Sequence, residues 1–433
     1  MTNELQLGPG GGQARVNVSA ALERLHRLYP RMIDLKIDRL QRLLADLGSP
    51  QLHLPPVLHV AGTNGKGSVC AIALAVAQAA GLRVHVFTSP HLVRFNERIR
   101  LAGELVTDEQ LAQALDAVEA ANQANQITIF EAITAAALWL FAKIPADLCI
   151  LEVGLGGRMD ATNLVFPAAC AITSISLDHQ DFLGDTLGKI ATEKAGIIKP
   201  NTPVVTGFQK DEALASIEAQ AALSHAPLLR RGQEWDVTPT DSGMVWQGVD
   251  LPRPALLGAH QVENAGIALT ALQAAGFEFS PDVMAKGLRA ATWPARLQKL
   301  EGALLGLLPQ GSELWLDGAH NPGGAEALAQ QLQRWQGPTT VVLGMKQSKD
   351  VAEFIRILAP HAAALYAVAE PTQHLALPVD KIIEASGGLA LAGPNIKGAF
   401  GQIKQPVRVL ICGSLYLAGE VLKLDEAVAF TNP

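Results

Sequence analysis

The sequence predicts an α/β protein of two domains, each built around a sheet of mainly parallel strands. The chain has 433 residues, which is too many for one ordinary hydrophobic core, because domains usually comprise about 100–200 residues. Hydrophobic residues make up 49% of the chain and aromatic residues 5%, which favours α/β layers over an aromatic-rich β-sandwich. Short apolar segments also alternate with segments of helical pattern, and this alternation is typical of a parallel sheet.

The first strand–helix unit follows an N-terminal segment with a helical pattern, residues 18–47, which Pro30 interrupts. A buried strand is expected over residues 55–61 and a second strand over 83–88. The alanine-rich residues 69–80 between them contain no helix breaker and predict a helix. A strand–helix–strand unit of this kind predicts the start of a parallel sheet.

The later units divide the chain into two domains. Further strands of the first domain are expected over residues 147–153, 168–176 and 203–206, with a β-hairpin over 236–248. Strands of the second domain are expected over residues 313–316, 339–343, 364–368 and 407–411. The boundary is expected near residues 294–298, which predicts one domain over residues 1–296 and a smaller one over 297–433.

Composition excludes several classes of protein. The net charge is −7, and the sequence shows no cluster of basic residues of the kind that binds phosphates, so nucleic-acid binding is not expected. The four cysteines are widely spaced and form no C-x-x-C pair, which argues against a zinc site or a disulfide framework and favours a reducing compartment. No apolar run approaches the ~20 residues that span a bilayer, and the polar N-terminus contains no apolar signal segment. We therefore expect a cytoplasmic protein without a membrane segment.

A glycine-rich segment stands between the first strand and its helix, where a phosphate loop must lie. It reads Gly62, Thr63, Asn64, Gly65, Lys66, Gly67, Ser68. Glycines allow backbone N–H groups to surround phosphate oxygens, and the helix N-terminus adds a favourable dipole. The generic pattern G-x-x-x-x-G-K-[ST] is not met, because Val60 replaces the first glycine and Gly67 follows the lysine. Taken alone, the segment is also compatible with a simple turn that carries a surface lysine.

The form A-G-T-N-G-K-G-S resembles the phosphate loop of the Mur ligase superfamily, in its folylpolyglutamate synthase and dihydrofolate synthase branch. Seven later blocks match the same branch in order, at residues 89–99, 152–163, 177–180, 193–197, 258–265, 293–296 and 317–322. The resemblance implies an ATPase domain with a phosphate loop and a parallel-rich sheet, followed by a smaller Rossmann-like domain that ligates glutamate. It also implies a monomer.

The resemblance implies ATP-driven amide formation. ATP phosphorylates a substrate carboxylate, the amine of L-glutamate attacks the acyl phosphate, and phosphate leaves. The substrates implied are dihydropteroate, which yields dihydrofolate, and folates, which yield polyglutamates. ATP and magnesium, expected as two ions, are the implied cofactors, with potassium as a further candidate.

The resemblance assigns magnesium to Ser89, Glu152 and His179, with Lys194 nearby as a carbamate. Without it, Glu152 could equally be a salt-bridge carboxylate, His179 a loop histidine and Lys194 an exposed helical lysine. Lys66, His179, Lys194 and His320 are the implied catalytic residues.

ATP contacts outside the loop are implied for Asn264, Arg296 and Asp317. Asn264 could read an adenine edge, while Arg296 could approach phosphate across the domain boundary. Asp317 could accept from the ribose or orient Arg296. As isolated residues, Arg296 and Asp317 could also be ordinary interdomain salt-bridge partners.

A pterin pocket is implied by Ile33, Asp34, Thr128, Ile129, Phe130, Glu131, Asp160 and Ala161. Phe130 could stack on the pterin ring and Asp160 could accept from its amino groups, although Phe130 could instead be a core residue.

Three alternatives remain open. A monofunctional folylpolyglutamate synthase differs only in the pocket. A Mur-type cell-wall ligase would carry a separate domain for a UDP-linked sugar, and too few residues precede Gly62 for one. A P-loop ATPase that switches conformation without forming a bond would need no second substrate.

Overall fold

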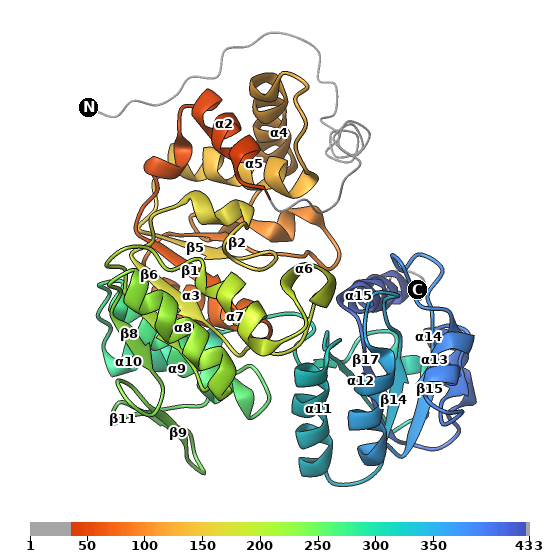
Figure 1. Ribbon diagram of the computed structural model, residues 1–433. Coiled ribbons are helices and arrows are strands. Elements are labelled where there is room, and N and C mark those ends of the chain that lie inside the picture. The colour runs from red at the N-terminus through yellow and green to blue at the C-terminus, as the bar shows by residue number, and fades with distance from the viewer. Residues whose placement is uncertain (1–35, 430–433) are drawn as a thin grey trace.

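The computed structural model describes residues 36–429. Figure 1 shows two α/β units side by side, the N-terminal one in red to green and the C-terminal one in cyan to blue. This arrangement confirms the fold class expected from the sequence. Ile33 and Asp34, which were expected in the pterin pocket, lie outside the described residues.

The N-terminal unit is built on an eight-stranded sheet of order β4-β3-β2-β5-β1-β6-β7-β8. Its strands are β1 (Val57–Ala61), β2 (Val84–Phe87), β3 (Ile99–Leu101), β4 (Glu104–Leu105), β5 (Leu148–Glu152), β6 (Ala169–Ile172), β7 (Val204–Thr206) and β8 (Leu228–Arg230). All neighbours pair in parallel except β3 and β4 at one edge. Val60 of β1 lies opposite Glu152 of β5, so the glycine-rich loop and this carboxylate leave the same edge of the sheet.

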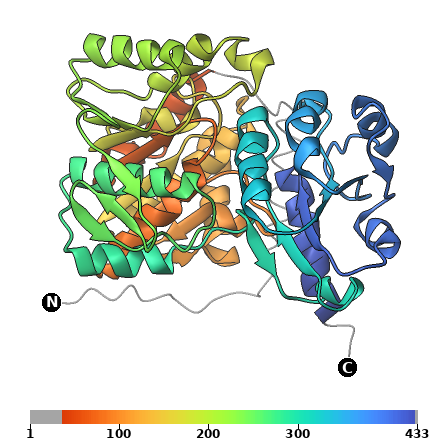
Figure 2. The same cartoon turned by 90° about the horizontal axis from the view of Figure 1, so that it is seen from below.

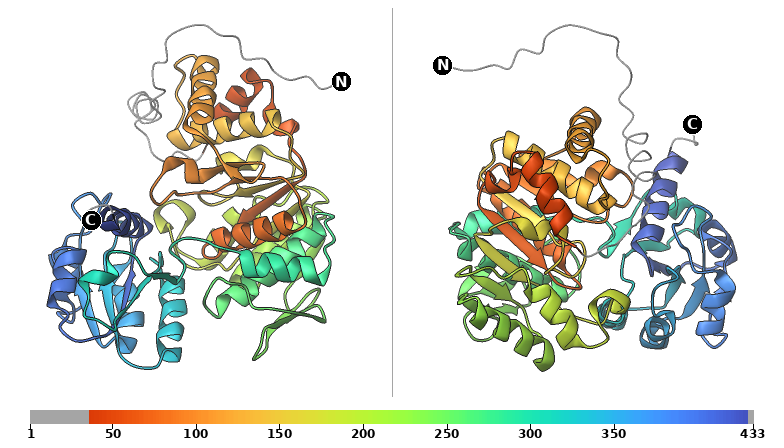
Figure 3. Two further views of the ribbon diagram at one scale, coloured as in Figure 1. Left: turned by 180° about the vertical axis from the view of Figure 1, so that it is seen from behind. Right: turned by 45° about the horizontal axis from the view of Figure 1, so that its top comes forward.

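Helices cover both faces of this sheet because its central strands are buried on both sides. Leu58 and Val60 of β1 pack on α3 (Lys66–Ala79), α9 (His260–Ala274) and α10 (Pro281–Ala290). Residues of the opposite parity pack on α2 (Asp38–Asp46), α4 (Asp108–Asn122), α5 (Ile129–Lys143), α7 (Leu187–Ala195) and α8 (Asp211–Leu223). Figure 3 shows these layers from behind and from above. Apolar residues on both parities explain why the strands read as continuous hydrophobic runs.

The hairpin expected over residues 236–248 is instead a three-stranded antiparallel sheet. Its strands are β9 (Val237–Pro239), β10 (Met244–Trp246) and β11 (Val249–Leu251). The second turn uses Gln247 and Gly248, both with positive φ (47° and 81°), as a two-residue hairpin loop requires. The sequence signal was weak because glutamine is an unusual residue at the first position of such a turn.

The C-terminal unit contains a six-stranded sheet of order β12-β13-β17-β14-β15-β16. Its strands are β12 (Gln298–Leu300), β13 (Glu313–Leu316), β14 (Thr339–Leu343), β15 (Ala364–Ala367), β16 (Leu391–Ala392) and β17 (Arg408–Cys412). One face packs on α11 (Pro322–Arg334), α12 (Val351–Leu358) and α13 (Val379–Ala385), and the other on α14 (Ile396–Gln402) and α15 (Leu415–Ala429). Figure 2 shows this unit from below, beside the larger one. The edge strands β12 and β16 were not expected from the sequence.

Among residues 36–429, no helix combines the length and the apolar character needed to cross a membrane.

Candidate functional site

The glycine-rich loop passes too close to its neighbours to carry side chains at its glycines. Gly62 and Gly65 have φ values of 142° and 92°, which favour glycine. A Cβ at Gly62 would lie 1.8 Å from Thr173 Oγ1, and one at Gly65 would lie 2.5 Å from Asn264 Oδ1. Helix α3 begins directly after Gly65, at Lys66 rather than at residue 69. Its free N–H groups therefore open into the loop, which is the geometry of an anion site.

Two lysines converge on this loop. Lys66 Nζ donates to the carbonyl oxygens of Gly62 (3.1 Å) and Thr63 (3.3 Å). Lys194 Nζ, from the last turn of α7, donates to the Gly62 carbonyl as well (2.9 Å). Lys194 is only 5% exposed, so the alternative of an exposed helical lysine is wrong. Burial, and then the charge of Lys66, lower the pKa of Lys194 to about 7.

Glu152 supplies a buried carboxylate beside the lysines. It ends β5, is 5% exposed, and accepts from the backbone N–H of Ser89 at 3.2 Å. Burial raises the pKa of Glu152, and the charge of Lys66 opposes that shift. A buried carboxylate with this donor set suits a hard cation such as Mg²⁺.

His179 follows β6 in a left-handed conformation (φ 52°). Burial lowers the pKa of His179 to about 4, so its imidazole is neutral and can act as a ligand. Among residues 36–429, no three His, Cys, Asp or Glu side chains form a metal-binding group. A cation here would therefore also need other oxygen donors, such as the Ser89 hydroxyl and phosphate.

Asp178 links the two units, a role that sequence reasoning missed. Its carboxylate accepts from Lys349 Nζ (2.5 Å) and Asn321 Nδ2 (3.0 Å), and it lies 3.5 Å from His320 Nε2. Burial opposes ionisation of Asp178, but the hydrogen bond and charge of His320, followed by Lys349 and His179, hold its pKa below the ordinary value. Asp178 and Asn321 stand inside the matching blocks, whereas Lys349 lies in a loop without a recognisable pattern.

Asn321 also contacts the glycine-rich loop directly. The amides of Asn64 and Asn321 form a reciprocal pair at 3.2 and 3.0 Å. The same Asn321 side chain accepts from Gly324 N–H at 2.9 Å and thereby caps α11. One buried amide thus joins the start of a C-terminal helix to the loop of the N-terminal unit.

Asp317 and Arg296 lie at the junction of the units, but no ion pair between them is seen among the described residues. Asp317 accepts from the backbone N–H groups of Leu297 and Ala319, both at 2.8 Å. Arg296 Nη1 donates to the carbonyl of Ala295 at 2.9 Å. Asp317 therefore holds the connection between the two sheets in place.

Asn264 lies on α9 against Gly65, where Asn264 Nδ2 donates to Gln261 Oε1 at 2.9 Å. Asn264 is 6% exposed, and its side chain packs against the loop at Gly65.

The expected pterin residues fall into two groups. Thr128 and Glu131 form the capping box of α5: Glu131 N–H donates to Thr128 Oγ1 at 3.2 Å, and Thr128 N–H donates to the Glu131 carboxylate. Glu131 also pairs with Arg39 at 3.1 Å. Ile129 is half-buried on the hydrophobic core. These three residues therefore start and anchor the helix that carries Phe130.

Phe130 and Asp160 meet at the turn that follows Glu152. A Cβ at Gly154 would lie 2.4 Å from Phe130 Cζ, so the ring rests directly on the glycine backbone. Asp160 is 3% exposed and accepts from Leu155 N–H at 2.8 Å. Ala161 follows it, 7% exposed, at the start of a short 3-10 helix. Phe130 and Asp160 therefore contact one glycine-rich turn, and Ala161 lies next to Asp160 in the chain.

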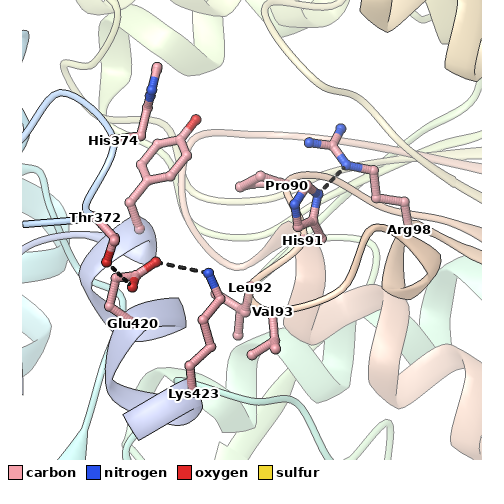
Figure 4. A pocket seen from close by; sticks show the side chains of 10 residues that line it. Pro90, His91, Leu92, Val93, Arg98, Thr372, His374, Glu420 and Lys423 are labelled. Carbon is pink, nitrogen blue, oxygen red and sulfur yellow. Dashed lines mark hydrogen bonds and ion pairs between the residues drawn. The ribbon is translucent and has the colours of Figure 1, made fainter. Parts of the chain in front are cut away.

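A cavity of about 190 Å³ lies between the two units. It is lined by residues of the 90–98 segment and, from the C-terminal unit, by Thr372, His374, Tyr416, Glu420 and Lys423. Figure 4 shows Arg98 donating through Nε to His91, while its two Nη atoms point away from the imidazole. Burial, and then the charge of Arg98, lower the pKa of His91 to about 4. Lys423 pairs with Glu420 at 2.9 Å, and Arg98 adds a further positive charge to the lining. The cavity therefore suits an anion.

Comparison with known proteins identifies both units. Residues 60–272 match the Mur ligase middle domain, and residues 296–415 match the Mur ligase glutamate ligase domain. The dihydrofolate synthase/folylpolyglutamate synthase of Escherichia coli is 33% identical over 96% of this chain and 97% of its own length. The folylpolyglutamate synthase of Lacticaseibacillus casei is 34% identical over 88% and 92%.

Solved structures agree with these relatives. Escherichia coli FolC in complex with DHPP and ADP superposes with a TM-score of 0.86, at 33% identity, over 96% of this chain and 99% of that one. A bifunctional folylpolyglutamate synthase/dihydrofolate synthase with Mn, AMPPNP and L-glutamate bound superposes with a TM-score of 0.84, at 33% identity, over 95% and 99%.

The two roles of Asn321 can be separated by substitution. Asn321→Ser keeps a capping oxygen but cannot reach Asn64, so we expect near-normal stability and a turnover lowered about tenfold. Asn321→Ala loses the capping contact as well as the contacts with Asn64 and Asp178, and we expect a further loss of about 1 kcal/mol in the free energy of unfolding. Thermal unfolding and steady-state kinetics measure the two effects.

Asn395 provides the control, because it caps α14 through Gly398 N–H (2.8 Å) away from this site. Asn395→Ala should lower stability alone. Wild-type turnover in Asn321→Ser would contradict the coupling between the units.

Proposed function

The chain belongs to the folylpolyglutamate synthase branch of the Mur ligase superfamily, and we propose that it has both dihydrofolate synthase and folylpolyglutamate synthase activity. It is an ATP-dependent ligase that joins L-glutamate to folates, and it uses ATP with a divalent cation. We assign ATP binding to residues 1–296 and glutamate ligation to residues 297–433. We further propose that the protein is a monomer and that it is located in the cytoplasm. All four cysteines are buried and none forms a disulfide, which supports a reducing compartment.

The reaction requires a carboxylate to become electrophilic. Transfer of the γ-phosphoryl group of ATP to the substrate carboxylate forms an acyl phosphate and ADP. The glutamate amine then attacks the acyl carbon, loses a proton, and displaces inorganic phosphate. Positioning and neutralisation of charge supply most of the catalysis in such a transfer.

The loop residues Gly62 to Ser68 would hold the phosphates of ATP, with Lys66 leaving the Gly62 and Thr63 carbonyls to reach the β- and γ-phosphates. Asn264 and Arg296 would contact the nucleotide from either side of the junction, and Asp317 would keep that junction closed. His320, oriented by the Gly318 carbonyl (2.8 Å), would stand beside the acyl phosphate. Closure of the units around Asp178 would exclude water from this intermediate.

Ser89, Glu152, His179 and a carbamylated Lys194 would hold magnesium, which neutralises charge on the transferring phosphoryl group when bound. Carbamylation requires a neutral amine, and Lys194 meets this condition because it is buried next to Lys66. Carbamylation replaces an ammonium ion with an anion. It would therefore remove the repulsion between the two lysines at the Gly62 carbonyl.

The interdomain cavity is our proposed site for L-glutamate. Lys423 pairs with Glu420 at 2.9 Å, and Arg98 offers two Nη atoms for a bidentate contact with one carboxylate of the amino acid. The cavity lies between the phosphate-loop unit and the glutamate ligase unit, as an acceptor site must.

The observation that carries bifunctionality is the turn at Gly154, which Phe130 covers and Asp160 supports. This arrangement places an aromatic ring and a carboxylate beside the reaction edge of the sheet, where a pterin ring could stack and donate hydrogen bonds. A monofunctional folylpolyglutamate synthase is the second candidate.

A product assay distinguishes these functions. Purified enzyme receives ATP, Mg²⁺ and L-glutamate with either dihydropteroate or tetrahydrofolate, and mass spectrometry detects the added glutamyl group. We expect product from both substrates. Product from tetrahydrofolate alone would identify a monofunctional enzyme, and ATP turnover indifferent to both would overturn the ligase function.

Lys66→Ala should lower kcat/KM about 10³-fold, because about 4 kcal/mol of transition-state stabilisation is lost with the ammonium group. Lys286→Ala is the control, since Lys286 is exposed on α10 and should leave the rate unchanged. Near-normal product formation by Lys66→Ala would overturn the assignment of the phosphate loop.

Lys194→Ala should lower activity about tenfold to a hundredfold, and short-chain carboxylic acids such as acetate should restore part of it. The control is Lys189→Ala on the same helix, whose side chain is 63% exposed and pairs with Asp185. Lys189→Ala should keep wild-type activity, and acetate should not change that activity. No rescue at any acetate concentration, together with unmodified lysine in high-resolution density, would contradict carbamylation.

A further inference from the structure

A chain of three buried side chains connects the strand that precedes the phosphate loop with the turn that follows Glu152. His59 Nε2 lies 2.8 Å from Thr162 Oγ1, and Thr162 Oγ1 lies 2.6 Å from Asp160 Oδ1. His59 and Thr162 have no exposed surface, and Asp160 is 3% exposed. The three residues come from β1 and from the segment 160–162, so the contact spans two segments far apart in the sequence.

The hydroxyl group of Thr162 determines which atom donates and which accepts in each of these two hydrogen bonds. A hydroxyl has one proton, and the short contact with the Asp160 carboxylate uses it. His59 Nε2 must therefore carry the proton donated to Thr162 Oγ1. The neutral imidazole then leaves Nδ1 as a bare acceptor, and His59 Nδ1 is indeed a buried atom without a hydrogen-bond partner among the described residues. Burial lowers the pKa of His59 to about 3, in agreement with a neutral ring.

This row of hydrogen bonds ends at the Asp160 carboxylate, which also accepts hydrogen bonds from the turn that follows Glu152. Besides the Thr162 hydroxyl, Asp160 accepts from Thr162 N–H (2.9 Å) and Leu155 N–H (2.8 Å). Leu155 is the neighbour of Gly154, on which the Phe130 ring rests. The orientation of Asp160 and the platform below Phe130 therefore depend on the same few hydrogen bonds. Burial raises the pKa of Asp160, and the hydrogen bonds donated by Thr162 and Leu155 oppose that shift.

We propose that His59 and Thr162 are positioning residues that orient Asp160 for recognition of the pterin ring. This inference rests on the proposed function, since it concerns the same substrate pocket. His59 has no access to the substrate and acts only through Thr162. A buried network of this kind fixes a recognition group more tightly than packing alone, because each member has one allowed arrangement.

The position of His59 explains why this network is specific to the pterin side of the site. It lies on β1, three residues before Gly62, yet its imidazole points to the sheet face opposite α3 and toward Thr162. The phosphate loop is held separately, by Thr173, Asn264 and the Gly62 carbonyl contacts. Loss of the network should therefore alter pterin binding while ATP binding is retained.

The test compares Thr162→Val, which removes the hydroxyl but keeps the shape, with Thr162→Ser, which keeps the hydroxyl. We expect Thr162→Val to raise KM for dihydropteroate about tenfold to a hundredfold, with KM for ATP changed less than about twofold. Thr162→Ser should restore the wild-type KM. His59→Leu should behave as Thr162→Val, and His59→Gln, whose amide can donate from the same place, should be close to wild type.

Thr270→Val is the matched control, because Thr270 is 2% exposed and its hydroxyl accepts from Trp246 Nε1 (3.0 Å) on the other face of the sheet. It should lower stability to a similar extent without changing KM for dihydropteroate. Equal losses for dihydropteroate and ATP in Thr162→Val, or no loss for either, would overturn the positioning role.

Failure of the positioning role can be distinguished from failure of the proposed dihydrofolate synthase activity. Binding of dihydropteroate to the enzyme with ADP, followed by protein fluorescence, reports on the pocket without any turnover. If wild-type enzyme binds and extends only tetrahydrofolate, dihydrofolate synthase activity is excluded, and the same variants are then compared for KM of tetrahydrofolate. An unchanged KM for tetrahydrofolate in Thr162→Val would then overturn the inference by itself.

Discussion

The structure depends on the close approach of three parts of the chain to the glycines of one loop. Gly62 meets Thr173 after β6, Gly65 meets Asn264 of α9, and Gly67 meets Trp293, where a Cβ would lie 2.7 Å from the indole Nε1. Any side chain at these glycines would displace backbone or a well-packed neighbour. The loop that can surround a phosphate is therefore also the point at which β6, α9 and the connection to the second sheet are held together. A defect in packing at any of these neighbours would alter the loop itself.

Charge at this point follows from the same crowding. The Gly62 carbonyl accepts from both Lys66 and Lys194, while the Glu152 carboxylate stands nearby with little solvent. A buried ammonium group and a half-buried one at the same carbonyl are unfavourable unless an anion joins them or one of them loses its charge. An anion such as phosphate would therefore be favoured at this point, and burial lowers the pKa of Lys194 toward the neutral amine that the proposed carbamylation requires. Both consequences come from burial rather than from any single strong contact.

The sequence predicted the features that depend on local pattern. The glycine-rich loop before α3, the central strands and the fold class could be inferred because glycine spacing and hydrophobic runs reflect local geometry. The contacts of Asp178 with Lys349 and Asn321 could not, since they join residues that only the packing of two units brings together. Thr128 and Glu131 show the opposite case. Their pattern matches a pocket, but an S/T-x-x-E spacing is also a helix start, and the structure uses their side chains for that purpose.

Asn321 shows how the fold and the chemistry share one group. Its carbonyl oxygen starts α11, and its amide nitrogen reaches both Asn64 and Asp178, so the C-terminal unit cannot rotate away without breaking contacts at the phosphate loop. An acyl phosphate hydrolyses if water reaches it before the amine does, and in the mechanism that we propose the two units would contribute opposite walls of the space where it forms. If the loop binds the phosphates as proposed, the direct hydrogen bonds between Asn64 and Asn321 would couple closure of the units to alignment of the phosphates. The exclusion of water would thereby be linked to the arrangement that permits phosphoryl transfer.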